Sequence, residues 1–190
     1  MDKKQRILLT MLELSVKQGF HATPMSQLAR EANVAVGTIY HYFEDKEQII
    51  EEIYMMIFKD FGVVLVANLK PDDGFKKQFE TMWVNLYNYF VSNPLAFKFS
   101  EFVGVPPLIS KKTVNKTKPY YEKIRDFFLL GIKEKHVRNM HVRLIMQMSY
   151  GNVISAVRLK IKDELPMDEL QQKRAIIASW DTIKYNGNNY

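Results

Sequence analysis

Cysteine is absent from this chain of 190 residues. Its absence excludes a disulfide scaffold, a thiol nucleophile and a thiolate metal site, and it suits a reducing compartment, so we expect a cytoplasmic protein. No apolar run approaches the ~20 residues of a membrane span, because the longest candidate, 61–69, is too short. The charged start, MDKKQR, lacks the apolar core and the cleavage site of a secretory signal.

Catalytic signatures are missing as well. The chain has no G-x-S-x-G elbow, no phosphate-binding loop and no dinucleotide fingerprint. His136 and His141 are five residues apart, which is the wrong spacing for two metal ligands on one helix face. We therefore expect no enzyme activity, no cofactor and no metal site.

Alternation of the strand type is absent too, and glycine and proline fall where they would end helices. The pattern predicts an all-α fold of about nine helices. The expected ranges are 3–17, 24–31, 35–42, 45–69, 75–92, 94–102, 120–135, 138–162 and 167–184. Whether the seventh begins before Pro119 stays open at this stage. We expect an N-terminal head at 1–47 and a larger helical body at 48–190.

The net charge of +6 agrees only weakly with a nucleic-acid partner. Residues 1–46 hold six Lys and Arg against five Asp and Glu, a surplus of one. The remaining excess lies around 111–118 and 133–143. Bulk charge therefore does not locate a DNA-binding face.

The most informative stretch is 25–46, MSQLAREANVAVGTIYHYFEDK. Thr23 and Pro24 form a start signal, a hydroxyl N-cap followed by proline at the first helical position. Asn33 tolerates the left-handed conformation of a sharp turn between two helices. In the next helix Ile39 and Phe43 can pack inward. The stretch thus predicts a helix-turn-helix.

Three short motifs stand out by their residue types and their spacing. They are G-F-x-x-T at 19–23, G-T-I-Y at 37–40, and Y-F at 42–43 followed by Lys46. Together they resemble the signature of the tetracycline-repressor (TetR) family of transcriptional regulators. The resemblance spans roughly residues 7–50. The rest of the chain matches that family only in length and helical plan.

The resemblance implies that helix 35–42 enters a DNA major groove. Gly37 lets the backbone approach the bases, Val36 can touch a thymine methyl, and Thr38 and His41 are the polar candidates there. Phosphate contacts are expected from Thr23, Tyr40, Tyr42 and Lys46. The base-reading set is small, so DNA shape is expected to contribute to specificity.

Three positions depart from the family pattern. Ser15 stands where the family usually has phenylalanine, which affects the packing of the first helix. Asn33 stands where the family has glycine, and it can serve the same turn. Ala35 stands where the family has serine or threonine, which removes a helix N-cap worth ~1 kcal/mol.

One helix-turn-helix contacts few base pairs, so two copies over a palindrome are expected. The resemblance implies dimerisation through the last two long helices, as a four-helix bundle. The expected interface is Leu144, Met148, Gly151, Ser155, Leu159, Ile176 and Trp180. Burial of the same residues within the subunit is the alternative, for Trp180 as for the others.

The body is rich in aromatic residues and methionine, which suits an effector pocket for a flat or apolar ligand. The expected lining is Trp83, Tyr87, Phe97, Phe102, Tyr121, Phe128 and Tyr150. Ordinary core packing is the alternative for each of them.

The sequence thus predicts a homodimeric, ligand-responsive transcriptional regulator, specifically a repressor released from a palindromic operator by a small hydrophobic or aromatic effector. One alternative is a helical carrier of lipids or small molecules whose head has lost DNA binding. The other is an enzyme that uses a cavity of the body, for which the sequence offers no catalytic constellation. The operator sequence, the identity and charge of the effector, the regulated genes and the choice between repression and activation stay open.

Overall fold

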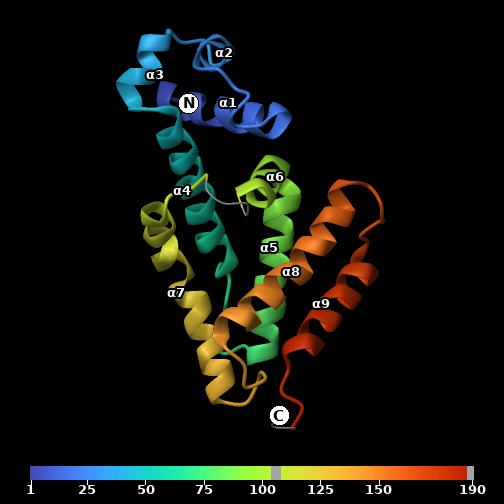
Figure 1. Cartoon of the computed structure of the whole chain (residues 1–190). Coiled ribbons are helices and arrows are strands. Elements are labelled where there is room, and N and C mark those ends of the chain that lie inside the picture. The colour runs from blue at the N-terminus through green and yellow to red at the C-terminus, as the bar shows by residue number, and fades with distance from the viewer. Residues whose placement is uncertain (104–107, 188–190) are drawn as a thin grey trace. The chain divides into compact units, whose positions relative to one another are not determined.

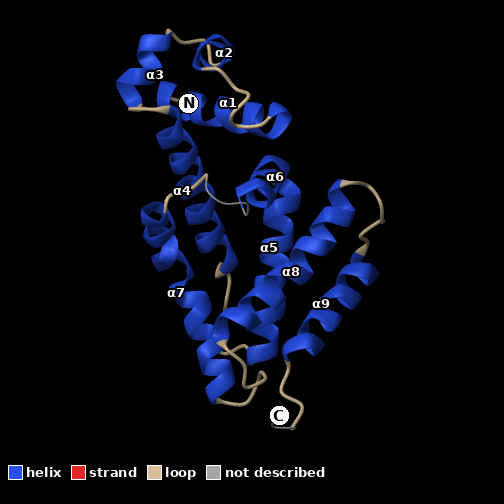
Figure 2. Cartoon of the chain, in the orientation of Figure 1, coloured by secondary structure: helices blue, strands red, loops and turns tan. Residues whose placement is uncertain are grey.

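Helices make up nearly all of the regular backbone. The computed structural model describes residues 1–103 and 108–187, with side chains for all of these except 102 and 103. Within that part of the chain there are nine helices and no strand (Figure 1, Figure 2). They are α1 (Lys3–Gln18), α2 (Met25–Glu31), α3 (Val36–Tyr42), α4 (Lys46–Leu65), α5 (Phe75–Ser92), α6 (Pro94–Val103), α7 (Lys111–Lys133), α8 (Val142–Ile161) and α9 (Glu169–Ile183). The all-α prediction is confirmed.

Local chemistry explains several helix ends. The carboxylate of Asp2 accepts a hydrogen bond from the Gln5 amide and caps α1, which ends at Gly19 with φ 92°. Asp168 caps α9 through the Gln171 amide at 2.8 Å. Helix α5 has the predicted bounds, because a glycine turn precedes it and Asn93-Pro94 follows it.

Helix α7 starts earlier than its expected core. It begins at Lys111 and continues through Pro119. The Glu51 carboxylate accepts hydrogen bonds from the Ser110 amide (3.0 Å) and the Thr113 hydroxyl (2.8 Å), which stabilises this first turn. A contact over some sixty residues of sequence is not readable from local patterns.

The chain packs as two compact units. The first consists of residues 1–60 and 93–118, and the second of residues 61–92 and 119–190. These units do not coincide with the expected division at residue 47, because packing assigns most of α4, all of the described part of α6 and the start of α7 to the same unit as the first three helices.

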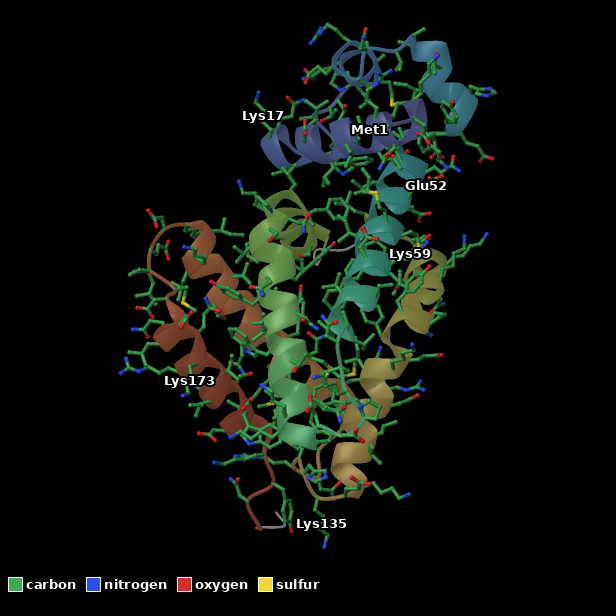
Figure 3. The ribbon with its side chains drawn as sticks, turned by 180° about the vertical axis from the view of Figure 1, so that it is seen from behind. Met1, Lys17, Glu52, Lys59, Lys135 and Lys173 are labelled. Carbon is green, nitrogen blue, oxygen red and sulfur yellow. The ribbon has the colours of Figure 1, made fainter. Side chains whose placement is uncertain are left out.

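In the first unit, α1 packs on α2, α3 and α6. Its fully buried side chains include Ile7, Met11, Leu28, Ile39 and Phe43. Figure 3 labels Met1 and Lys17 at the two ends of α1 and Glu52 on α4. The carboxylate of Glu52 lies 2.8 Å from the Lys4 ammonium, so α1 and α4 are also joined at the surface.

In the second unit, α8 packs on α5 and α9. Asn85 donates to the carbonyls of Leu65 and Ala67, which fixes the end of α4 against α5. Val137 forms an isolated bridge with Lys184. Bends at Asn139 and Met140 follow this bridge, and α8 begins at Val142, four residues later than the predicted 138. None of the helices in the described residues is long and apolar enough to cross a membrane.

Candidate DNA-binding site

The turn between α2 and α3 has the predicted geometry. Asn33 adopts φ 50°, the left-handed region expected for it. The Val34 amide donates to the Ala29 carbonyl at 3.0 Å and closes the turn. The two helices are therefore held at a fixed angle by backbone bonds.

The inner face of α3 is sealed, as predicted. Ile39 is 0% exposed and Phe43 is 1% exposed. The Lys4 ammonium lies 5.5 Å from the centre of the Phe43 ring. Helix α3 is thus anchored by one face and cannot rotate without opening the core.

The outer face of α3 is open. Tyr40 is 54% exposed, Val36 41% and Tyr42 37%, and His41 is exposed as well. A Cβ added at Gly37 would meet nothing within 4 Å. Thr38 is half-buried. These residues form one surface, which we call the α3 face: Val36, Gly37, Thr38, Tyr40, His41 and Tyr42.

The start of α3 lacks a side-chain cap. Ala35 is the N-cap residue and makes no side-chain hydrogen bond. The first amides of α3 therefore stay free of a competing side-chain acceptor. Such amides suit a phosphate oxygen.

Thr23 corrects the sequence prediction. Its side chain is 0% exposed, and its hydroxyl donates to the Gly19 carbonyl at 3.0 Å. Pro24, not Thr23, is the N-cap of α2, with no side-chain bond. The predicted capping is wrong, and a phosphate cannot reach a hydroxyl that is buried inside the loop before α2.

Lys46 has two internal partners. Its ammonium lies 4.5 Å from the centre of the Phe20 ring and donates to the His21 carbonyl at 3.3 Å. Burial lowers the pKa of Lys46, an effect that the nearby Glu47 carboxylate opposes. The ammonium still has donors to spare, since it carries three protons. Lys46 therefore both fastens α4 to the loop before α2 and presents positive charge.

The family follows from comparison with known proteins. A sequence model described as bacterial regulatory proteins, tetR family, matches residues 7–53. A second, described as tetracyclin repressor-like, C-terminal domain, matches residues 74–184, more than half of the chain. The chain belongs to the TetR family.

Relatives of this TetR-family chain include an uncharacterized HTH-type transcriptional regulator of Haemophilus influenzae, 32% identical over 93 residues. That match covers 49% of this chain and 50% of the relative, so the chain spans about half the length of that curated relative. A TetR family protein of Vibrio parahaemolyticus has a similar structure, with a TM-score of 0.83, 27% identity, and coverage of 97% of this chain and 100% of its own.

A third comparison adds a ligand-bound structure. The regulator FadR of Bacillus subtilis, solved in complex with stearoyl-CoA, has a TM-score of 0.74 at 19% identity. The match covers 97% of this chain and 99% of FadR. At that identity the likeness shows the fold alone.

The residues expected to line the pocket of this TetR-family chain are only partly brought together. Trp83 stacks on Tyr87, with ring centres 5.5 Å apart. Tyr121 and Tyr150 both contact the ring of Phe61, at 5.6 and 6.3 Å. Phe61 was missed, although it follows Tyr54 by seven residues on the same helix. The five rings in these contacts all lie in the second unit: Phe61, Trp83, Tyr87, Tyr121 and Tyr150.

The other expected pocket residues are distributed differently. Phe128 is buried in the second unit, next to Phe79. Phe97 is 2% exposed and belongs to the first unit. The side chain of Phe102 lies outside the described residues. Burial raises the pKa of Tyr87, consistent with an apolar interior. The indole N–H of Trp83 is buried without a hydrogen-bond partner.

The residues expected at the interface divide into two groups. On α8, Leu144 is 49% exposed, Gly151 and Ser155 are exposed, and the Ser155 hydroxyl donates back to the Gly151 carbonyl. Met148, Leu159 and Ile176 are half-buried. The Trp180 ring packs within its own subunit, 5.4 Å from Phe79.

One further feature of the second unit lies on its surface. An open groove lies between α5 and α9, lined by Lys76, Glu80, Glu169, Gln172, Lys173, Ile176 and Ile177. Figure 3 labels Lys173 on α9. Among the described residues, no group of three His, Asp or Glu side chains could hold a metal ion.

Proposed function

We propose that this TetR-family chain is a transcriptional regulator that reads operator DNA with the α3 face. One observation carries the proposal: α3 is sealed along Ile39 and Phe43, yet it exposes Tyr40, His41 and an unobstructed Gly37 on the opposite side. More than half of the Tyr40 side chain is exposed, so packing within the subunit explains little of its presence at this position. A helix of this shape fits a major groove.

Base contacts would come from the first turns of α3. Gly37 offers close approach, Val36 an apolar contact with a thymine methyl, and His41 and Thr38 polar contacts to base edges. The free amides at the start of α3 and the hydroxyls of Tyr40 and Tyr42 would bind phosphates. Lys46 would neutralise a further phosphate. Thr23 has no part in this set, because its hydroxyl is buried.

The regulator would act as a homodimer on a palindrome. Support comes from apolar side chains exposed on α8 and α9, namely Leu144, Leu170 and Ile177. The exposed Gly151 and Ser155 would allow a close helix crossing between copies. Two α3 helices would then enter successive major grooves about 34–36 Å apart.

A small hydrophobic effector would release the protein from its operator, so the protein would act as a repressor. It would be located in the cytoplasm, where the DNA is. The aromatic cluster of the second unit supports an apolar ligand. Because the structurally similar FadR was solved with stearoyl-CoA, we propose a ligand with a long acyl chain. The ligand would act only through its unequal affinity for the DNA-competent state and the released state. On this proposal, 1–47 reads DNA and 48–190 binds the effector and the second copy.

Selection of an operator from random duplexes, followed by fluorescence polarisation at about 0.15 M salt, tests the proposal. The protein should prefer a palindromic duplex, and Tyr40→Ala and Lys46→Ala should each weaken binding at least several-fold. Lys123→Ala, in the second unit, is the control and should bind normally. The absence of any preferred duplex, with ligand binding retained, would instead favour a carrier that has lost DNA binding.

A further inference from the structure

Four lysines crowd the start of α7. Lys111, Lys112, Lys116 and Lys118 are all exposed, and 111–118 contains no acidic residue. This lysine cluster belongs to the first unit, the same one that carries α2 and α3.

The contacts of α7 with α4 direct the lysine cluster outward. Thr113 and Thr117 are 3% and 1% exposed and make up the inner face of these two turns. Ser110 and Thr113 donate to the Glu51 carboxylate of α4, and Figure 1 shows the first turns of α7 alongside α4. The helix end itself is therefore already capped by Glu51. What remains available is the set of lysine ammonium groups.

These lysines decide the sign of the charge of the first unit. Its residues 1–60 hold seven Lys and Arg against nine Asp and Glu, and 93–118 add five Lys and one Glu. The unit thus has twelve bases and ten acids, a surplus of two. Without the four lysines it would carry eight bases and ten acids. A unit that approaches DNA would then be repelled by it.

The position of the lysine cluster also has an energetic cost. The N-terminal end of a helix carries partial positive charge, so lysines in the first turn of α7 are unfavourable there. The Glu51 carboxylate at this helix end offsets part of that cost and also attracts Lys116. An anionic partner would add to this effect.

The lysine cluster is tied to the same half of α4 as the proposed phosphate contact. Glu51, which holds the start of α7, follows Lys46 by five residues, a rise of about 7.5 Å along the helix. Lys46 is the phosphate contact of the proposed site. A duplex longer than the base pairs read by α3 offers further phosphates to the lysine cluster.

We propose that the lysine cluster binds the phosphate backbone of duplex DNA outside the base pairs read by α3. This inference rests on the proposed function. The contact would be independent of sequence and would add affinity and salt dependence, since each neutralised phosphate releases counterions.

Two duplexes with the same selected operator test the inference. One ends at the outermost base pairs required for recognition, and the other extends by ten base pairs on each side. The wild-type protein should bind the extended duplex several-fold more tightly. The variant K111Q/K112Q/K116Q/K118Q should lose that advantage. Its slope of log affinity against log salt on the extended duplex should fall by about 0.9 for each lost contact.

A matched control carries the same charge change elsewhere. K123Q/K133Q/K135Q/K160Q removes four exposed lysines of the second unit and should keep the advantage of the extended duplex. Circular dichroism and urea unfolding should show the cluster variant folded, with an unfolding midpoint close to that of the wild type, because all four side chains are exposed.

The inference fails if the wild type binds both duplexes equally, or if the cluster variant retains the length advantage. It also fails if the cluster variant loses binding to phosphatidylserine vesicles while its binding to both duplexes is unchanged, since the partner would then be an anionic membrane. If the wild type prefers no duplex at all, the proposed function fails, and this inference fails with it.

Discussion

At the scale of single residues, substitution of Gly37 should affect stability and DNA binding in opposite directions. It lies within α3 with open space where a side chain would be. Gly37→Ala should raise the free energy of unfolding by up to about 1 kcal/mol, because alanine loses less backbone entropy in a helix. The same methyl should weaken operator binding by about tenfold or more if α3 approaches the bases closely. Urea unfolding and fluorescence polarisation measure the two effects.

Gly74→Ala provides the comparison for this prediction. A Cβ added at Gly74 would also meet nothing within 4 Å, and Gly74 lies before α5 in the second unit. Its substitution should leave operator affinity unchanged. Unaltered operator affinity in the Gly37→Ala variant would place the DNA contact away from the first turn of α3.

Burial of individual side chains was predictable where periodicity was strong. Ile39 and Phe43 lie inward as expected, and Tyr40 and His41 lie outward. Thr23 was not predictable in this way. The Thr-Pro pair indicates an N-cap in isolation, but the hydroxyl instead bonds to the Gly19 carbonyl of the preceding loop. The Thr23 hydroxyl could have accepted a hydrogen bond from a first-turn amide of α2 or donated one to the Gly19 carbonyl, and the packed structure contains the second.

At the scale of helices, Glu51 couples α4 to α7. Burial alone would raise the pKa of Glu51, but hydrogen bonds from Ser110 and Thr113 outweigh burial and hold the pKa below its usual value. Since the folded pKa is depressed, the stabilisation is complete above the ordinary glutamate pKa of about 4.3 and is lost as pH falls through the folded pKa. Glu51→Gln should therefore cost about 1 kcal/mol near neutral pH, and the difference from the wild type should shrink in acid.

Urea unfolding across pH 3–7 measures that difference, and hydrogen exchange should show faster opening of the first turn of α7. Glu122→Gln changes an exposed carboxylate on the same helix and serves as the control. A Glu51→Gln deficit that stays constant down to pH 3 would contradict this account, because it would then not depend on the carboxylate charge.

Helices α4 and α7 also meet closely in the second unit. A Cβ at Gly62 would lie 2.7 Å from the Tyr120 carbonyl oxygen and 2.7 Å from its Cβ. Backbone atoms cannot give way as a flexible side chain can, so Gly62→Ala should cost about 1–3 kcal/mol. Thermal unfolding checks this prediction. Unchanged stability would mean that the two helices can separate freely at this crossing.

Helix bounds were predictable where helix-ending residues lie next to the helix in the sequence. Gly74 and Asn93-Pro94 flank α5, and its predicted bounds are confirmed. The start of α7 was left open, because its stabilising partner Glu51 lies far away in sequence. The start of α8 was predicted four residues too early, since the pairing of Val137 with Lys184 competes with the helix. Long-range contacts account for both differences.

At the scale of the whole molecule, the two units are interleaved along the chain. Helices α4 and α7 each pass from one unit to the other, at Asp60–Phe61 and at Lys118–Pro119. A sequence division at residue 47 separates the helix-turn-helix signature from the rest, but it cannot reveal that 93–118 packs with the signature. The two continuous helices are the covalent route by which an effector in the second unit could bias the DNA-reading unit.

Dimerisation is the last expectation at this scale. Leu144 on α8 and Ile177 on α9 are 49% and 44% exposed, so a charge at either position costs little in an isolated subunit. At an interface each charge would be buried without a partner, at a cost of several kcal/mol. The double variant Leu144→Glu/Ile177→Glu should therefore shift the solution mass to the 22.3 kDa of one chain and weaken binding to a full palindrome far more than to a half-site. Light scattering after size exclusion measures the mass.

Leu129→Glu/Leu130→Glu on α7, at 44% and 46% exposure, is the matched control and should remain dimeric. A Leu144→Glu/Ile177→Glu protein that stays dimeric would remove α8 and α9 from the interface, and the spacing of the two α3 helices would then have to be set by another pairing.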